Sequence, residues 1–131
     1  MVKYRAPCQL YNNRKAIKYH RRGIVGIDFS GINNDNFHLE DYREIIEKAK
    51  TAGLGVTTHS GELISDNDIW KAIELIKPQR IGHGIRAAYD KHLMQEIAKR
   101  NIILEICPLS NLMTNAVEHA FAKKGGLDAY L

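Results

Sequence analysis

The chain has 131 residues, of which 44% are apolar and 26% are charged, and it carries a formal net charge of +4. This length suits one domain with its own hydrophobic core, and the composition is that of an ordinary soluble globular protein. No apolar stretch reaches the roughly 20 residues that cross a bilayer, and the first residues lack a signal-peptide core. We therefore expect a cytoplasmic protein with no membrane partner.

The positive charge is concentrated at the start of the chain, where residues 1–22 contain seven lysines and arginines and no acidic residue. The rest of the chain has 12 basic and 15 acidic residues, which gives a net charge of −3. No RNA-binding aromatic motif accompanies the basic segment. We therefore interpret it as the solvated face of a helix and expect no nucleic-acid partner. Residues 1–13 have no further assignment.

From residue 14 onward, short β-branched runs alternate with segments of helical periodicity, and glycines mark the joints. The expected strands are residues 24–28, 55–59, 80–83 and 102–106. The expected helices are residues 39–52, a helix capped at one of residues 66–68 and ending near 76, residues 90–100, and about 115–124.

The ends and buried faces of these helices also follow from the sequence. Gly53 should end the first helix, and the second should end before Pro78. Asp90 should cap the third helix, whose periodic apolar positions predict burial. Those positions are Leu93, Met94, Ile97 and Ala98.

Strands that alternate with helices in this way predict an α/β fold of parallel βα units. A doubly wound sheet and a (β/α)8 barrel both fit, but no G-x-G-x-x-G follows a strand, so the barrel is favoured. A full barrel takes roughly 250 residues, and four strands in residues 1–131 make about half of one, in a single partial domain. Unpaired strands at the two edges of such a sheet favour self-association.

Polar residues follow these strands, and the carboxyl ends of parallel barrel strands share one mouth. His59 ends the second strand, where an imidazole is a natural ligand for zinc. Glu62 comes three residues later, where a carboxyl group kept protonated by burial can act as a general acid. His83 stands between Gly82 and Gly84, which let the backbone approach a ligand closely. Each of these residues, taken alone, also fits a structural role.

Two more candidates follow the first strand. Asp28 offers a buried carboxylate and Gly31 a bare backbone N–H, although a simple turn before a helix has the same composition. The two cysteines, Cys8 and Cys107, are expected to be reduced. We interpret Cys107, which precedes Pro108, as the end of a strand, because no feature of the sequence lowers the pKa of its thiol.

Taken together, four motifs resemble those of the adenosine deaminase family. They read G-I-D-F-S-G at residues 26–31, H-S-G-E at 59–62, R-I-G-H-G at 80–84 and C-P-L-S-N at 107–111. The corresponding family motifs are approximately G-[IL]-D-L-[AS]-G, H-[AS]-G-E, R-[IV]-G-H-G and C-P-x-S-N, in this order. The similarity spans about residues 14–126. It implies a (β/α)8 barrel that removes the 6-amino group of adenine-type substrates by hydrolysis and uses one zinc ion.

The resemblance also implies a role for each matching residue. His59 would be a zinc ligand, and Glu62 would protonate the purine ring nitrogen beside the attacked carbon. His83 would orient the attacking hydroxide, and Gly31 and Asp28 would contact the substrate. The expected substrate is adenosine or 2′-deoxyadenosine, which would become inosine in purine salvage. Adenine or an N6-modified AMP is an alternative substrate, and a non-catalytic half-barrel fragment is an alternative function.

The sequence departs from the family at both ends of the metal site. The family's zinc also needs an H-x-H pair on the first barrel strand and an aspartate pair on the last. No H-x-H occurs here, and Asp128 is too early and has no aspartate beside it. Catalytic zinc normally needs three protein ligands. We therefore expect a central-to-C-terminal portion of such an enzyme, which by itself binds zinc weakly and turns over adenosine negligibly.

Overall fold

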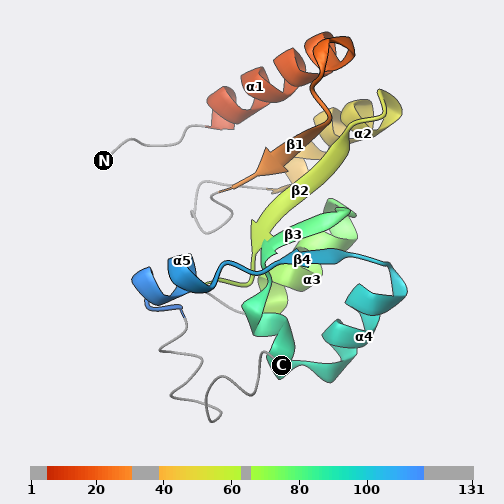
Figure 1. The fold of residues 1–131 in the computed structure, drawn as a ribbon. Helices are drawn as coiled ribbons and strands as arrows, with labels where there is room; N and C mark the ends of the chain where they lie inside the picture. Colours follow the sequence, from red (N-terminus) through yellow and green to blue (C-terminus); the bar gives the residue numbers. More distant parts are fainter. Residues whose placement is uncertain (1–5, 31–38, 63–65, 117–131) are drawn as a thin grey trace.

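The computed structural model describes residues 6–30, 39–62 and 66–116. Its centre is a sheet of four strands in the order β1-β2-β3-β4, and every neighbouring pair is parallel (Figure 1). The strands are β1 (Gly26–Phe29), β2 (Gly55–Ser60), β3 (Arg80–His83) and β4 (Ile103–Glu105). No helix in the described ranges is long and apolar enough to span a membrane.

Helices connect the strands and precede the sheet. In chain order they are α1 (Ala6–Tyr19), the 3-10 helices η1 (His20–Arg22) and η2 (Leu39–Tyr42), α2 (Arg43–Thr51), α3 (Asp66–Leu75), the 3-10 helix η3 (Ile85–Tyr89), α4 (Lys91–Lys99) and α5 (Pro108–Met113). Sequential strands that pair in parallel and are joined by helices are βα units. The expected α/β fold, about half of a (β/α)8 barrel, is confirmed.

Local chemistry explains where the helices begin and end. Gly53 adopts a φ of 82° just after α2, a conformation that glycine tolerates without strain. The Asp90 carboxylate accepts hydrogen bonds from the backbone N–H groups of His92 and Leu93, which caps α4 as expected. Pro108 occupies the first turn of α5, where its missing N–H leaves no hydrogen bond unmade.

The two faces of the sheet differ. Alternate strand residues point to opposite faces, and those that face the helices are buried. They form the helix-covered face: Ile27, Phe29, Val56, Thr58 and Ile81. The residues between them form what we call the open face, which is more exposed and mostly polar: Asp28, Thr57, His59, Arg80, Ile103 and Glu105. The register pairs residues of the same face across neighbouring strands.

Two hydrophobic clusters lie between the helices and the sheet. The first joins α2 and the preceding Tyr42 to β1 and β2: Ile27, Phe29, Tyr42, Ile45, Ile46, Ala49, Leu54, Val56 and Ile76. The second joins α3 and α4 to β3: Ile69, Ile73, Ile81, Ala87, Leu93, Ile97 and Ile102. Both clusters pack against the helix-covered face, so hydrophobic burial stabilises the fold mainly on that side of the sheet.

Two strands are shorter than expected. β1 begins at Gly26, which lies opposite Gly55, and the expected start at residues 24–25 is wrong. Val25 is 82% exposed, and its carbonyl accepts the Gly55 N–H at the point where pairing begins. β4 covers three residues instead of the expected 102–106.

The helices differ from expectation in two places. Met94 is 43% exposed, and Ala98 is also exposed, because the buried stripe of α4 is limited to Leu93 and Ile97, four residues apart. The short helix α5 was not expected at all. The expected last helix, from about 115 to 124, begins at Ala116, directly after a turn in which Asn115 has a φ of 56°, and residues 117–124 lie outside the described residues.

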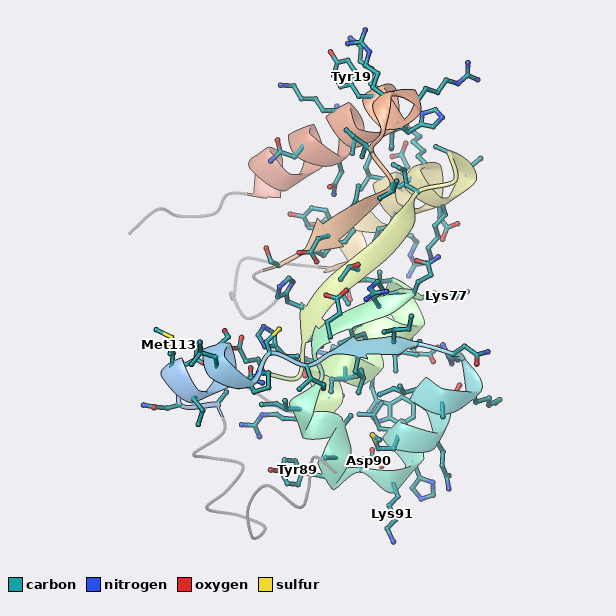
Figure 2. All side chains as sticks on the ribbon, viewed as in Figure 1. Tyr19, Lys77, Tyr89, Asp90, Lys91 and Met113 are labelled. Atoms are coloured by element: carbon teal, nitrogen blue, oxygen red, sulfur yellow. The ribbon has the colours of Figure 1, made fainter. Side chains whose placement is uncertain are left out.

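The basic segment has the solvated helix face that the sequence predicts. Arg14, Lys15 and Lys18 are exposed on α1, and Arg21 and Arg22 are exposed on η1. The cations of Lys18 and Arg22 lie 5.4 and 5.2 Å from the ring centre of Tyr19, which Figure 2 shows at the opposite end of the molecule from Lys91.

Candidate active site

The site begins with His59 on the open face of β2. Its Nδ1–H donates to the Asp28 carboxylate on β1 at 3.1 Å. The ring packs on Gly82, its register partner on β3, where a Cβ would lie only 3.2 Å from the ring carbon Cδ2. The hydrogen bond to Asp28 raises the pKa of His59, and this effect outweighs the opposing effect of partial burial. Asp28 therefore fixes the tautomer and orientation of the His59 ring.

His83 reaches the same place through an unusual backbone conformation. Strand alternation would direct it to the helix-covered face beside Ser60, its register partner. Its φ of 68° breaks the alternation, and the following N–H, of Gly84, donates to the carbonyls of Gly82 and Ser60. The His83 ring then lies 5.4 Å, centre to centre, from the ring of His59. A bulky residue in this conformation is strained, and such strain is typical of functional sites.

Glu62 completes the group from the turn after β2. Gly61 makes the turn with a φ of 71°, and it leaves no room for a side chain, because a Cβ would lie 2.3 Å from Cδ1 of Ile69. Glu62 Oε2 lies 3.4 Å from His83 Nε2, and the two side chains are only 17% and 8% exposed. Glu62 Oε1 accepts a hydrogen bond from Thr114 Oγ1 at 3.0 Å.

Two other side chains hold these elements in place. Asn111, on α5, is completely buried, and its Oδ1 lies 2.7 Å from His83 Nδ1. Asp68, on α3, accepts the Gly61 N–H through Oδ2 at 2.9 Å and so supports the turn that carries Glu62. Burial raises the pKa of Asp68.

Some of the residues in this site were predicted from the sequence, and others were found only in the structure. The structure brings His59, Glu62 and His83 together at the carboxyl ends of β2 and β3, and it places Asp28 against His59. Gly31 lies outside the described residues. Sequence reasoning did not place in the site three residues that contact it: Asp68, Asn111 and Thr114.

Each of the three had a different signal. Asn111 ends the C-P-L-S-N motif, and Pro108 marks the first turn of the helix that carries it, so its importance could have been found. Asp68 was expected only as a helix cap. Thr114 lies in no motif, and its contact with Glu62, 52 residues away, is purely tertiary.

The described residues do not make a zinc site by themselves. Within residues 6–30, 39–62 and 66–116, no group of three histidine, cysteine or carboxylate side chains is placed to hold a metal. His59 supplies one nitrogen ligand, because its Nδ1 is held by Asp28 and its Nε2 remains for a metal, an arrangement common among metal-binding histidines. Cys107 is a free thiol that contacts the Glu105 carbonyl at 3.3 Å.

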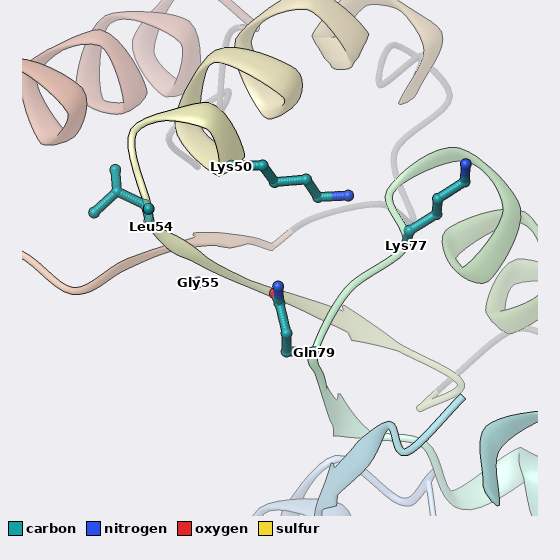
Figure 3. Close-up of a pocket in the computed structure, with 6 residues that line it drawn as sticks. Lys50, Leu54, Gly55, Lys77 and Gln79 are labelled. Carbon is teal, nitrogen blue, oxygen red and sulfur yellow. The ribbon is translucent and has the colours of Figure 1, made fainter. Parts of the chain in front are cut away.

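The amino ends of the strands, opposite the site, carry a pocket lined by different residues. An open pocket of about 390 Å³ lies at the amino ends of β2 and β3 (Figure 3) and is lined by Lys50, Gly53, Leu54, Gly55, Lys77 and Gln79. Lys50 donates to the Ile76 carbonyl, and burial lowers the pKa of its ammonium group. None of the histidines and carboxylates described above lines this pocket.

The order of the motifs and their convergence at one edge of the sheet agree with comparisons to known proteins. The adenosine deaminase family model matches residues 3–123, which is most of the chain. The chain belongs to the adenosine deaminase family.

Several relatives of this family match the chain. It is 40% identical over 111 residues to the adenosine deaminase of Plasmodium gallinaceum, with 80% of this chain and 30% of the relative covered. It is 37% identical over 97 residues to the adenosine deaminase of Plasmodium vivax (strain Salvador I), with 72% and 26% covered. The chain thus spans less than a third of the length of these curated relatives.

A solved structure shows the same architecture. The crystal structure of adenine deaminase from Arthrobacter aurescens superimposes with a TM-score of 0.74 at 27% sequence identity. The match covers 88% of this chain and 35% of that chain. The proteins that this chain resembles are thus named for a nucleoside, adenosine, and for a free base, adenine.

Proposed function

We propose that this segment forms part of the active site of a hydrolytic deaminase of aminopurines, with adenosine or 2′-deoxyadenosine as the preferred substrate. The observation that carries the proposal is the position of Glu62, which faces His83 Nε2 beside His59 in a sheltered part of the rim. An acid and a base side by side are what the addition of water to a purine ring carbon requires.

The proposed chemistry assigns a proton to each of these residues. Attack at the carbon that carries the amino group disrupts the aromatic ring, so the adjacent ring nitrogen must gain a proton as water adds. Glu62, whose side chain is only 17% exposed, would supply that proton. His83 would orient the attacking water and accept its proton through Nε2.

Thr114 holds Glu62 in this position. Its Oγ1–H donates to Glu62 Oε1 at 3.0 Å, which ties the carboxyl group to the end of α5.

Zinc is the metal that we propose for the whole enzyme, with His59 as one ligand. The other ligands would come from outside the described residues. When bound, zinc would lower the pKa of water and so supply a nucleophile at neutral pH. Asp28, which orients His59, would act on the metal through that ring, and Gly31 and Asp28 remain candidates for contact with the purine.

The free base is the second candidate substrate, favoured by one observation. The superimposed Arthrobacter structure is an adenine deaminase, whereas the Plasmodium relatives, at 37–40% identity, are adenosine deaminases. We propose adenosine first because of the higher identity to the adenosine deaminases. N6-modified AMP is a third substrate to compare in the same assay.

The experiment uses a chimera in which residues 3–123 replace the matching segment of the Plasmodium gallinaceum adenosine deaminase. Zinc content and the rates with adenosine, adenine and N6-methyl-AMP are measured for the chimera and for His59→Ala. The exposed His92 on α4 offers a matched control, His92→Ala. We expect adenosine to react fastest, and His59→Ala to lose both zinc and activity while the control keeps both. A fully active His59→Ala chimera would refute the proposal.

We also propose that the isolated 131-residue chain associates with itself through the edges of its sheet. β1 and β4 each pair on one side only in the described sheet, and exposed apolar side chains lie along β4 and α5. They are Ile103, Ile106, Leu109, Leu112 and Met113. Sedimentation should show oligomers at micromolar concentration that Ile103→Lys weakens, and a stable monomer would contradict this.

A further inference from the structure

We propose that Asn111 is a positioning residue that holds His83 as its Nδ1–H tautomer, which leaves the lone pair on Nε2 directed toward Glu62 and the reacting water. The inference deepens the proposed function, because it explains how His83 is prepared to accept a proton. It assigns a task to the C-P-L-S-N motif, whose last residue the chemistry above did not use.

The geometry of the contact supports this assignment. Asn111 Oδ1 lies 2.7 Å from His83 Nδ1, and this is a buried contact between side chains 28 residues apart. An amide oxygen can only accept a hydrogen bond, so Nδ1 must carry a hydrogen. In a neutral imidazole the other nitrogen, Nε2, is then an acceptor, and this is the nitrogen 3.4 Å from Glu62 Oε2.

The energetic cost of burying Asn111 points in the same direction. Its Nδ2 is buried and has no hydrogen-bond partner in the part of the chain that the structure describes. An unpaired buried donor costs about 1–3 kcal/mol, so an apolar residue would serve the packing of α5 better. We infer that the amide is present for its oxygen.

The backbone makes the contact necessary. The φ of 68° at His83 directs its ring out of the regular strand alternation, and the next residue, Gly84, also has a positive φ, of 62°. The ring therefore depends on side-chain contacts for its orientation. Asn111 holds one nitrogen of the ring, and Glu62 lies beside the other.

Nuclear magnetic resonance of the 131-residue chain labelled with 15N-histidine tests the tautomer without any need for activity. We expect His83 to be the Nδ1–H tautomer when neutral. Asn111→Leu, which has a similar size and no acceptor, should lose this preference and populate both tautomers. Asn111→Asp should retain it, because a carboxylate also accepts from Nδ1–H. The matched control is Leu112→Ala on the same helix, where the side chain is 56% exposed.

The outcomes separate this inference from the proposed function. An Nε2–H tautomer in the wild-type chain would mean that the amide nitrogen faces His83, and the inference would be wrong. An unchanged Nδ1–H tautomer in Asn111→Leu would also overturn it, and the amide proton spectrum of the same sample shows whether that variant is folded. The tautomer can be as expected even if the chimera proves inactive, so the two proposals can fail separately.

Kinetics of the chimera then show whether the tautomer matters for turnover. Asn111→Leu should lower kcat by about 10–100-fold with little change in KM, because the substrate still binds but the base is misoriented. Asn111→Asp should recover most of this loss. A rise in KM alone, or a fall in kcat that Asn111→Asp does not recover, would contradict the positioning role.

Discussion

The two faces of the sheet are built from the same strands but serve different purposes. On the helix-covered face, Phe29 and Ile81 are completely buried among hydrophobic side chains from the helices. On the open face, His59 and Asp28 keep 42% and 45% of their side-chain surfaces exposed. One residue step along a strand therefore separates a position that stabilises the fold from a position available for chemistry.

This difference teaches where to look for function in a parallel sheet. Side chains on the helix-covered face pack against helices of the same chain, so substitutions there should change the free energy of unfolding. On the open face, polar side chains of neighbouring strands contact one another, as His59 contacts Asp28 and Arg80 contacts Glu105. Substitutions there should leave stability nearly unchanged and act on the site.

The largest expected effect is a loss of stability on the helix-covered face. Ile81→Ala removes a fully buried side chain from the second cluster and should lower the free energy of unfolding by about 2–5 kcal/mol. Ile103→Ala is the matched control on β4, where the side chain is 51% exposed, and should cost less than about 1 kcal/mol. Urea unfolding of both variants measures the difference, and equal losses would break the comparison between the faces.

A smaller effect is expected from an added methyl group on the open face. A Cβ at residue 82 would lie 3.2 Å from the His59 ring and displace it by a few tenths of an ångström. Gly82→Ala in the chimera should therefore lower kcat/KM by roughly 10–100-fold, with little loss of stability.

Gly55→Ala provides the control on the same face. A Cβ there would make only an ordinary contact of 3.6 Å with the Val25 carbonyl oxygen. This variant should keep its full activity. If both alanine variants were fully active, the close packing of His59 on β3 would have no functional importance.

The smallest effect concerns pH. Burial raises the pKa of Asp68 above its value of 3.8 in model compounds, so the folded state holds this proton more tightly than the unfolded state. Stability from this group is greatest below the unfolded pKa and is lost as pH rises through the higher folded pKa. Asp68→Asn stays neutral and keeps an oxygen for the Gly61 N–H.

The measurement is urea unfolding of wild type and Asp68→Asn between about pH 3 and pH 7. The free energy of unfolding of Asp68→Asn, relative to wild type, should increase as pH rises. A constant or decreasing difference would mean that ionised Asp68 is stabilised by its partners at the turn.

Much of the fold could be predicted from sequence because its signals are local. Gly53 and Asp90 end and begin helices through chemistry that involves only neighbouring residues. The exposure of Met94 and Val25 could not be predicted, because it depends on which part of a helix or strand finds a partner. A pattern of apolar residues predicts an element but not the width of its buried stripe.

The site divides in the same way. The positions of His59, Glu62 and His83 at strand ends follow from the order of the elements, and their motifs match a known family. The hydrogen bond between Asn111 and His83 depends on a φ of 68° and on a short helix that begins at Pro108. Such contacts join distant segments, and only the folded chain reveals them.

We propose that Glu62, held at the rim beside His83, is the acid of a deaminase. The most direct test is the kcat for adenosine of the chimera carrying Glu62→Gln, with zinc content and unfolding midpoint measured on the same preparation. The account predicts a fall in kcat of roughly 10²–10⁴-fold with metal and stability unchanged. A kcat equal to that of the unsubstituted chimera would contradict it.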